Sequence, residues 1–334
     1  MAPVVIYRLG SLGDTVVALP CFHRIAQSFP NVERIVLTNY PVANNAPPLF
    51  EVLRGSGIIH KTIEYPLGLR SPRKVLRLRN KLKNTEAETL IYLAAPRGLP
   101  AVIRDLAFFR FCGFKRIIGT PTSRDLRSNI VDYATGEIEP EYSRLARTLA
   151  ELGKIDLDNP ASWDIHLSGE EKRKAQRLLQ PFNGVPLLAI NMGGKAIQKD
   201  WGAENWAALI VRLGQIFFNC GLVVMGASED DVRASYVASL WPGSSLNLCG
   251  KLTPREASAV MQKAKLFIGH DSGPLHLAAA AGVKCIGIFG NYNKARKWHP
   301  WGKGNCVLQS SVGIDAIKVE QVFGVARCLL KNQS

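Results

Sequence analysis

The chain has 334 residues, 47% of them hydrophobic and 21% charged, a composition that excludes an intrinsically disordered protein. This length exceeds what one hydrophobic core usually serves, so two domains are expected. The 42 Lys and Arg residues outnumber the 27 Asp and Glu residues, and the resulting charge of +15 predicts an anionic partner such as nucleic acid, a phosphorylated sugar or an acidic membrane.

The seven cysteines are scattered and form no C-x-x-C pair, which argues against a disulfide scaffold or a structural zinc site and favours a reducing cytosol. The first residues do not resemble a signal peptide, and no run approaches the roughly 18 apolar residues that span a bilayer. We therefore expect a cytoplasmic protein, and any membrane contact is expected to be peripheral, at the cytoplasmic face of the inner membrane.

Short apolar runs alternate with helical segments along the first half of the chain. The run Val4–Tyr7 is followed by a glycine loop, Gly10–Asp14, and by a helical pattern from Thr15 to about Phe29. Alternation of β and α elements predicts a parallel sheet covered by helices. The other predicted strands are Arg34–Leu37, Gly57–Ile63, Thr89–Leu93 and Arg116–Gly119, with helices between them.

The second half repeats this alternation after a helix over 141–152 and a polar segment, Lys154–Asp164, which is the candidate linker. The predicted fold class is therefore α/β, with two Rossmann-like domains, residues 1–160 and 161–334, facing a central cleft. The predicted strands are Leu187–Asn191, Leu222–Met225, Leu266–Ile268 and Cys285–Phe289. The predicted helices are Asn205–Phe218, one that begins at the capping box Thr253-Pro-Arg-Glu256, and Pro274–Ala281.

The glycine loop carries the first candidate site. Gly10 and Gly13 let the backbone turn sharply and approach a ligand, and the helix start behind Ser11 offers N–H groups to an anion. The spacing is neither the G-x-G-x-x-G of a dinucleotide site nor that of a P-loop. Asp14 has two interpretations: a simple helix N-cap, or a carboxylate at the carboxyl edge of the sheet that acts as a general base.

The segment from His270 to Gly282 is again a strand, a loop and a helix. The backbone N–H groups of Ser272 and Gly273 are predicted to face an anion such as a diphosphate at the start of the alanine-rich helix. Asp271 and His276 either contact a sugar or phosphate, or Asp271 only caps the helix and His276 is a buried, satisfied histidine.

Two further groups are basic. Gly194 and Lys195 follow a predicted strand and, with Lys199, suit a phosphate site, although a solvated surface lysine is the alternative for Lys195. The second group is a basic run from Arg70 to Lys83, after which the first acidic residue is Glu86. This run is either an ordinary amphipathic helix or a surface for anionic lipid or a phosphorylated acceptor. Its cations are Arg70, Arg73, Lys74, Arg77, Arg79, Lys81 and Lys83.

At these residues the sequence resembles glycosyltransferase family 9, the heptosyltransferase-like enzymes of lipopolysaccharide core synthesis. The anchors are Arg8-Leu-Gly-Ser-Leu-Gly-Asp14 and Asp271-Ser-Gly-Pro-Leu-His276, and the resemblance runs over nearly the whole chain. It implies a GT-B architecture in which the N-terminal domain binds the acceptor and the C-terminal domain binds the donor.

The resemblance also implies residue roles. Asp14 matches the catalytic aspartate, Lys199 a lysine on the donor phosphate, and Asp271 an aspartate that holds the transferred sugar. The other expected donor-binding residues are Gly194, Lys195, Ser272, Gly273 and His276, and the expected acceptor- or anion-binding residues are Gly10, Ser11, Gly13, Arg70, Arg73, Lys74 and Arg77.

We expect an inverting transfer of heptose from ADP-heptose to a lipopolysaccharide core acceptor of the lipid A–Kdo type. Neither a metal nor a cofactor is expected, because the sequence has no carboxylate cluster that resembles a magnesium or manganese site. Some relatives place a glutamate on the nucleoside where Ser228 and Glu229 stand here, so the nucleotide base stays open. A non-catalytic nucleotide-sugar-binding protein is one alternative. An NAD(P)-dependent oxidoreductase is another, although the dinucleotide fingerprint is missing and Glu33 lies in a weak context for its acidic residue. Nucleic acid is not an expected partner, because no recognised binding motif occurs.

Overall fold

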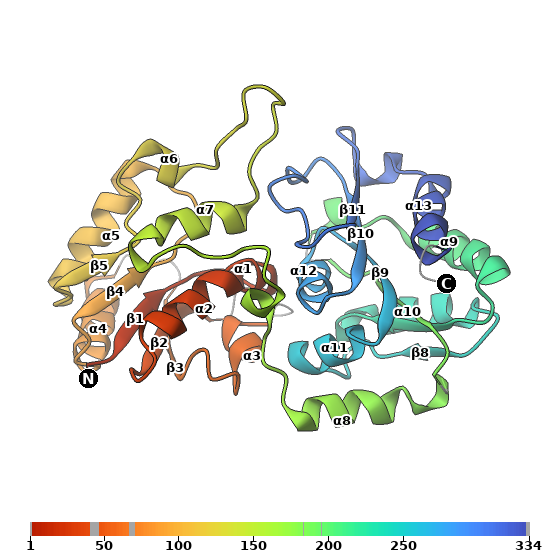
Figure 1. Ribbon diagram of the computed structural model, residues 1–334, viewed down its shortest axis with the longest axis horizontal. Helices are drawn as coiled ribbons and strands as arrows, with labels where there is room; N and C mark the ends of the chain where they lie inside the picture. Colours follow the sequence, from red (N-terminus) through yellow and green to blue (C-terminus); the bar gives the residue numbers. More distant parts are fainter. Residues whose placement is uncertain (1, 41–46, 67–70, 183, 195, 332–334) are drawn as a thin grey trace. The chain divides into compact units, whose positions relative to one another are not determined.

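The computed structural model describes residues 2–40, 47–66, 71–182, 184–194 and 196–331. The chain divides into two compact units, Met1–His166 and Leu167–Ser334, and each is a parallel sheet covered by helices (Figure 1). Within the described ranges, every helix is too short or too polar to traverse a lipid bilayer. The predicted α/β fold with two parallel sheets is thus confirmed.

The N-terminal sheet has five strands in the order β3-β2-β1-β4-β5. Its central strand, β1, pairs with β2 on one side and β4 on the other, with Val4 opposite both Arg34 and Thr89. The chain order reverses between β1 and β4, so the loop after β1 lies at the switch point where open α/β sheets bind ligands. The strands are β1 (Val4–Tyr7), β2 (Arg34–Asn39), β3 (Lys61–Tyr65), β4 (Thr89–Tyr92) and β5 (Arg116–Ile118).

Helices cover both faces of this sheet (Figure 1). Leu78 and Leu82 of α4 (Pro72–Lys83) and Phe109 of α5 (Leu99–Phe111) share one hydrophobic cluster with Tyr7 and Tyr92. On the other face, α2 contacts α7 and α1 contacts α3. The remaining helices of the unit are α1 (Leu12–Val16), α2 (Leu19–Ser28), α3 (Leu49–Leu53), α6 (Arg124–Arg127) and α7 (Glu141–Thr148).

Three local predictions differ from the structure. The helix expected from Thr15 to Phe29 is two helices, and Asp14 lies inside the first of them. The strand expected at Gly57–Ile63 begins only at Lys61, because Gly55 and Gly57 turn the chain with φ of 72° and 73°. The helix expected over 141–152 ends at Thr148 and continues as a 3₁₀ turn, Ala150–Leu152.

The candidate linker Lys154–Asp164 is folded onto the first unit. It contains a 3₁₀ turn, Pro160–Trp163, and the indole of Trp163 is buried. This indole donates to the carbonyl of Leu157 at 3.0 Å and meets the ring of Tyr142 edge-to-face. The division between the two units therefore falls after His166, beyond this segment.

The C-terminal sheet has six strands in the order β11-β10-β9-β6-β7-β8. The chain order reverses between β6 and β9, so the loops that follow these two strands share a second switch point. Two short edge strands, β8 and β11, escaped prediction. The strands are β6 (Leu187–Asn191), β7 (Gly221–Met225), β8 (Ser245–Asn247), β9 (Ala264–His270), β10 (Lys284–Phe289) and β11 (Cys306–Gln309).

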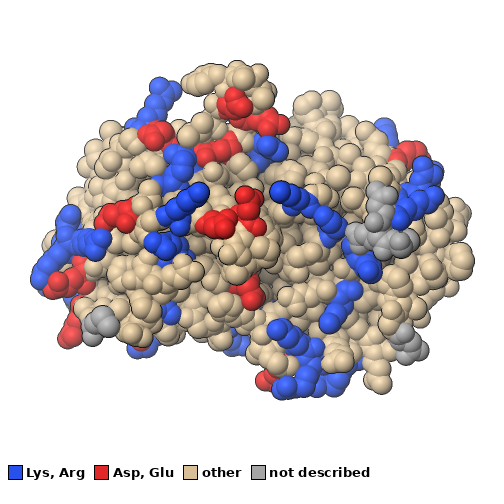
Figure 2. Space-filling view, in the orientation of Figure 1, with Lys and Arg blue, Asp and Glu red and all other residues tan. Residues whose placement is uncertain are grey.

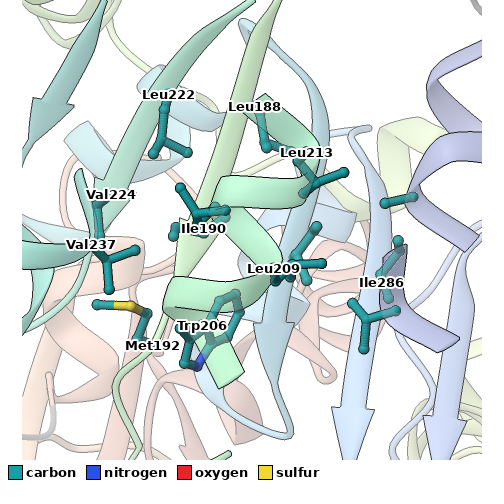
Figure 3. Close-up of a cluster of buried hydrophobic side chains, with 14 of the residues drawn as sticks. Leu188, Ile190, Met192, Trp206, Leu209, Leu213, Leu222, Val224, Val237 and Ile286 are labelled. Carbon is teal, nitrogen blue, oxygen red and sulfur yellow. The ribbon is translucent and has the colours of Figure 1, made fainter. Parts of the chain in front are cut away.

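The main core of this unit lies between the sheet and α9 (Ala203–Ile216), α10 (Asp231–Ser239) and α13 (Val319–Lys331). Figure 3 shows Ile190 and Leu188 of β6 turned toward Leu209 and Leu213 of α9. Helix α12 (Gly273–Ala280) contacts β9 and β10, and α11 (Pro254–Met261) contacts α8 (Gly169–Leu178). The predicted capping box at Thr253 is confirmed: its side chain accepts the N–H of Glu256.

Candidate functional site

Asp14 is the third residue of α1, and its carboxylate faces back toward the start of that helix. Oδ2 accepts the backbone N–H of Ser11 at 2.8 Å and the Ser11 hydroxyl at 3.1 Å. Ser11 is therefore the N-cap and Asp14 is the N3 residue of a capping box, so Asp14 has a helix-capping role without being the N-cap itself. The carboxylate is half-buried, and Oδ1 receives no hydrogen bond from the described residues.

The loop before Asp14 is held from two sides. The N–H of Gly10 donates to Oδ1 of Asn39, at the carboxyl end of the neighbouring strand, at 2.7 Å. The buried guanidinium of Arg8 donates to the backbone carbonyl of Asp14 at 2.6 Å and to that of Leu93 at 3.3 Å. Asp14 is thus fixed relative to three strands of the sheet.

A buried ion pair supports Arg8. Glu141 and Arg144 of α7 are each 1% exposed and are joined by hydrogen bonds of 2.6 and 3.1 Å. Burial lowers the pKa of Arg8, whereas the carboxylates of Asp14 and Glu141 raise it. The negative charge of Glu141 therefore helps to keep the buried Arg8 in its charged form and compensates the charge of Arg144, with which it pairs.

In the C-terminal unit, the loops after β6 and β9 bring Lys199 and Asp271 together. Lys199 Nζ lies 2.8 Å from Asp271 Oδ2 and donates to the Asp271 carbonyl at 3.0 Å. Asn293 donates to the same carboxylate at 2.6 Å, and the ring of Tyr292 lies beneath the ammonium, 4.8 Å from Nζ. A cation, a carboxylate, an amide and an aromatic ring thus meet at the carboxyl edge of the sheet.

Ser272 and Gly273 begin α12 directly beside this cluster. Ser272 is its N-cap, with an extended backbone and no side-chain cap. The backbone N–H groups of Ser272 and Gly273 donate no hydrogen bond to the part of the chain that the structure describes. A helix start with unpaired N–H groups attracts anions through its partial positive charge, and Lys199 lies on the same side.

His270 holds the segment that follows Lys199 in place through hydrogen bonds to two tryptophans. It is fully buried, and its Nε2 accepts the backbone N–H of Trp201 at 3.3 Å and the indole N–H of Trp206 at 3.2 Å. Burial lowers the pKa of His270 to about 4, so the ring is neutral at pH 7 and Nδ1 carries the proton. Nδ1 is turned toward the Gly193–Gly194 backbone.

An ion-pair network holds the neighbouring residue, Asp200. Arg233 binds the Asp200 carboxylate at 2.5 Å, Asp230 at 3.3 Å and the Met192 carbonyl at 2.9 Å. Burial favours the protonated acid, but the Gly202 N–H and the Arg233 guanidinium outweigh it and hold the pKa of Asp200 below its usual value. The turn that carries Lys199 is therefore tied to β6, β9 and α10.

The two glycines after β6 differ in their steric requirement. A Cβ atom on Gly193 would lie 2.1 Å from Oδ2 of Asp230, whereas one on Gly194 would make only ordinary contacts of 3.9 and 4.0 Å. Gly193, which the sequence also indicates as part of the glycine pair after this strand, is thus the position that packing requires. Gly194 leaves room beside Lys199 and His270.

The structure does not bring the other predicted residues into the two clusters around Asp14 and Lys199. His276 is buried on α12 with its ring centroid 6.1 Å from that of Trp298. Arg73, Lys74 and Arg77 are exposed on α4, with no recorded contact to Gly10, Ser11, Gly13 or Asp14. Ser228 and Glu229 are both exposed after β7, and Ser228 donates to the Glu229 carboxylate at 3.3 Å. Arg70 and Lys195 lie outside the described residues.

Several polar residues at the carboxyl edges were not predicted. Arg97, after β4, donates to Asp105 at 2.6 Å and to the hydroxyl of Tyr7 at 3.4 Å. Asn39 is the last residue of β2 and Asn293 lies in the loop after β10, and a polar residue at or after a strand end is the signal that predicts such positions. Among the described residues, no three His, Cys, Asp or Glu side chains converge as a metal site would require.

Comparison with known proteins identifies the family of the chain. The family model of glycosyltransferase family 9 (heptosyltransferase) matches residues 124–321, a range that includes Lys199 and Asp271. Lipooligosaccharide heptosyltransferase 2 of Campylobacter jejuni is 27% identical over 183 residues, which cover 48% of this chain and 56% of that protein. The chain thus spans about half the length of this curated relative.

Two solved structures share the fold over nearly their whole length. The family 9 glycosyl transferase of Veillonella parvula has a TM-score of 0.74 at 18% identity, with 99% of this chain and 98% of that one covered. The Escherichia coli heptosyltransferase WaaC with ADP has a TM-score of 0.68 at 17% identity, with 98% and 99% covered. Because the family match covers more than half of the sequence, the chain belongs to glycosyltransferase family 9, the heptosyltransferase family.

Proposed function

We propose that the protein is an inverting glycosyltransferase that moves heptose from ADP-heptose to a lipopolysaccharide core acceptor of the lipid A–Kdo type. The observation that carries this proposal is the meeting of Lys199 and Asp271 beside the start of α12. A diphosphate needs a cation and N–H donors, and a sugar needs a carboxylate that accepts from its hydroxyl groups. Family membership and the fold shared with an ADP-bound heptosyltransferase support the same donor.

In this proposal the C-terminal unit binds the donor. Lys199 and the N–H groups of Ser272 and Gly273 hold the diphosphate, with Gly194, Lys195 and His276 around it, and Asp271 holds the sugar. The diphosphate shares the Lys199 ammonium with Asp271 and leaves as an anion stabilised by these preorganised donors. Because they neutralise the leaving group, we propose that no divalent metal or other cofactor takes part.

Asp14 is the proposed general base. As the acceptor oxygen forms its bond to the anomeric carbon, the bond from that carbon to the diphosphate oxygen breaks, and the acceptor proton passes to Asp14. Both Ser11 hydrogen bonds reach Oδ2, which supports Oδ1 as the atom that takes the proton. Gly10, Ser11 and Gly13, with Arg73, Lys74, Arg77 and Arg70, are the proposed contacts to an anionic acceptor.

We place this reaction in the cytoplasm, at a site that an acceptor anchored in the inner membrane can reach. The acceptor-binding role of the N-terminal domain, residues 1–160, and the donor-binding role of the C-terminal domain, residues 161–334, belong to the same proposal. Nucleic acid has no part in it.

A release assay tests the proposal. Protein is mixed with a delipidated core acceptor and a panel of nucleotide-sugars in EDTA, and release of nucleoside diphosphate is followed. We expect acceptor-dependent release from ADP-heptose in the wild type. Asp14→Asn keeps an oxygen for the Ser11 bonds but loses the base, so kcat should fall by about 10²–10⁴ while the unfolding temperature is retained.

The other outcomes separate the alternatives. Donor binding without release from any nucleotide-sugar would identify a non-catalytic binding protein. Binding of NAD(P)H would favour an oxidoreductase. Release that is lost in EDTA would contradict metal independence, and wild-type turnover in Asp14→Asn would contradict the base assignment.

A further inference from the structure

The outer surface of α4 and α5 combines exposed apolar side chains with an excess of cations. We name this surface, formed by Pro72–Lys83 and Leu99–Phe111, the α4–α5 face. The two helices lie on the same face of the N-terminal sheet, and their outer sides carry none of the residues of the hydrophobic cluster beneath.

Helix α5 is apolar on both sides. Val102 and Phe109 are buried toward the sheet, as expected for a helix that covers a core. Leu99, Ile103, Ala107 and Phe111 recur at i, i+4, i+8 and i+12 and form a second, exposed stripe on the opposite side, where Ile103 is 56% and Phe111 50% exposed. A stripe of this length has no role in the core and favours an apolar partner.

Helix α4 supplies the charge. Six of its twelve residues are cations and none is acidic. Leu76 is 49% exposed, and Arg73, Asn80 and Lys83 neighbour it at helical spacing. None of the six cations forms an ion pair with a carboxylate of the described residues. Because no described carboxylate neutralises them, their charge is available to an external anion.

One contact joins the two helices into a continuous surface. The guanidinium of Arg79 lies 4.4 Å above the ring of Phe111, and its Nε donates to the Phe111 carbonyl at 3.0 Å. On α5, Arg104 and Arg110 border the apolar stripe. The acid within these two segments is Asp105, which is buried and paired with Arg97 and Arg104.

We propose that the α4–α5 face binds the surface of an anionic phospholipid bilayer, with the stripe of α5 inserted among the acyl chains near the headgroups and Lys81 and Lys83 of α4 on the lipid phosphates. Charge complementarity argues for this partner: a protein surface rarely offers acids as densely as an anionic membrane, whereas interfacial helices combine apolar and basic sides in this way. This inference rests on the proposed function only in that a lipid-anchored acceptor lies in such a bilayer.

Vesicle sedimentation tests the inference with the full chain. The probes are vesicles of phosphatidylcholine alone and of phosphatidylcholine with 30% phosphatidylglycerol, a composition chosen as roughly that of an anionic membrane. We expect binding to the anionic vesicles that weakens as salt is raised. Lys81→Glu/Lys83→Glu should weaken it at least tenfold, because each basic residue near such a surface contributes roughly a fivefold factor. Ile103→Ser/Phe111→Ser should weaken it severalfold at constant charge.

Helix α8 provides a matched control. Lys172 and Arg173 are exposed there, within a basic cluster that Figure 2 shows over this helix, but its exposed positions carry no apolar stripe. Lys172→Glu/Arg173→Glu changes the net charge as much as the α4 pair does and should leave at least half of the binding. If the α4 variant and the α8 variant lost vesicle binding equally, net charge alone would explain the effect, and the proposal would be overturned.

Other outcomes are equally decisive. Equal binding to neutral vesicles, or no effect of either α4–α5 variant, would contradict the inference. A change of oligomeric state in Ile103→Ser/Phe111→Ser, with vesicle binding unchanged, would identify the stripe as a contact between copies of the chain. Release from the delipidated acceptor should stay at the wild-type rate in all three variants, so failure of the transferase proposal and failure of the membrane proposal are distinguishable.

Discussion

Gly10 and Asp14 occupy one space in the loop after β1: a Cβ atom on Gly10 would lie 2.3 Å from Cβ of Asp14 and 2.8 Å from its Oδ2. Any side chain at position 10 must therefore displace the carboxylate. Gly10 also has φ of 141°, so its backbone conformation adds strain to a substitution.

We expect Gly10→Ala to lower kcat by about 10²-fold, because a misplacement of about 1 Å has that cost in a positioned site. The release assay measures it. Gly55→Ala is the control, since Gly55 has φ of 72° but no atom within 4 Å of the added Cβ. Gly55→Ala should cost about 1 kcal/mol of stability and leave kcat unchanged. Equal kcat in Gly10→Ala and the wild type would show that Asp14 need not stay where it is.

Lys199 and Asp271 should act as a coupled pair. Lys199→Met is expected to raise the KM for the donor about 10–100-fold with a smaller effect on kcat, because the cation contacts the diphosphate in both ground and transition states. With Asp271→Asn and the double variant, a cycle of unfolding free energies should give a coupling of about 1–3 kcal/mol. Additive effects of the two substitutions on unfolding would contradict the pairing.

His270 should make stability depend on pH. Its pKa is lowered from 6.5 to about 4 by burial. Above pH 6.5 the ring is neutral in both the folded and the unfolded state, so it does not lower the free energy of unfolding. Between pH 6.5 and 4 only the unfolded state binds the proton, so the free energy of unfolding falls with falling pH, by about 3 kcal/mol in total.

Urea unfolding at pH 7, 5.5 and 4.5 measures this contribution. His270→Gln keeps an acceptor for the Trp201 and Trp206 N–H groups but cannot titrate, so its free energy of unfolding should fall less steeply below pH 6.5 than that of the wild type. Parallel pH profiles would mean that another group causes the loss, for example His23, His60 or His299, whose pKa values burial also lowers.

Glu141 should matter more for stability than an exposed carboxylate. Glu141→Gln leaves the buried Arg144 without its counter-charge and is expected to cost about 3 kcal/mol. Glu151→Gln breaks an ion pair with Arg116 whose partners are both more than half exposed, and should cost less than about 1 kcal/mol. Thermal unfolding compares them, and similar losses would refute a special role for the buried pair.

The sequence predicts the fold well where strands are buried on both faces. Val4–Tyr7 and Leu187–Asn191 are unbroken apolar runs with clear turns after them, and the structure has both strands at those bounds. The edge strands β8 and β11 escaped because three or four partly exposed residues carry no periodic signal. The strand near Gly57 was placed too early because an apolar pair, Ile58 and Ile59, packs in the core without pairing in the sheet.

The candidate site was predictable only in part. Glycine loops and charged residues after strands predict Asp14, Lys199 and Asp271. Each of these residues follows its own strand along the chain, so the sequence alone shows where it lies relative to that strand. The partners Asn39 and Asn293 come from neighbouring strands, and only sheet order makes them neighbours. The sequence assigns no role to His270, because its two tryptophan partners are 64 and 69 positions away along the chain.

The position of the site loops within each sheet has a further consequence for local opening. β1, β6 and β9 each have a strand paired on both sides, whereas β3, β5, β8 and β11 are paired on one side only. Amide hydrogens of the edge strands can therefore exchange with solvent through small openings that leave β1, β6 and β9 intact. The edges of both sheets can fray and re-form without disturbing the strands that precede Asp14, Lys199 and Asp271, so exchange protection of β1, β6 and β9 should follow global unfolding.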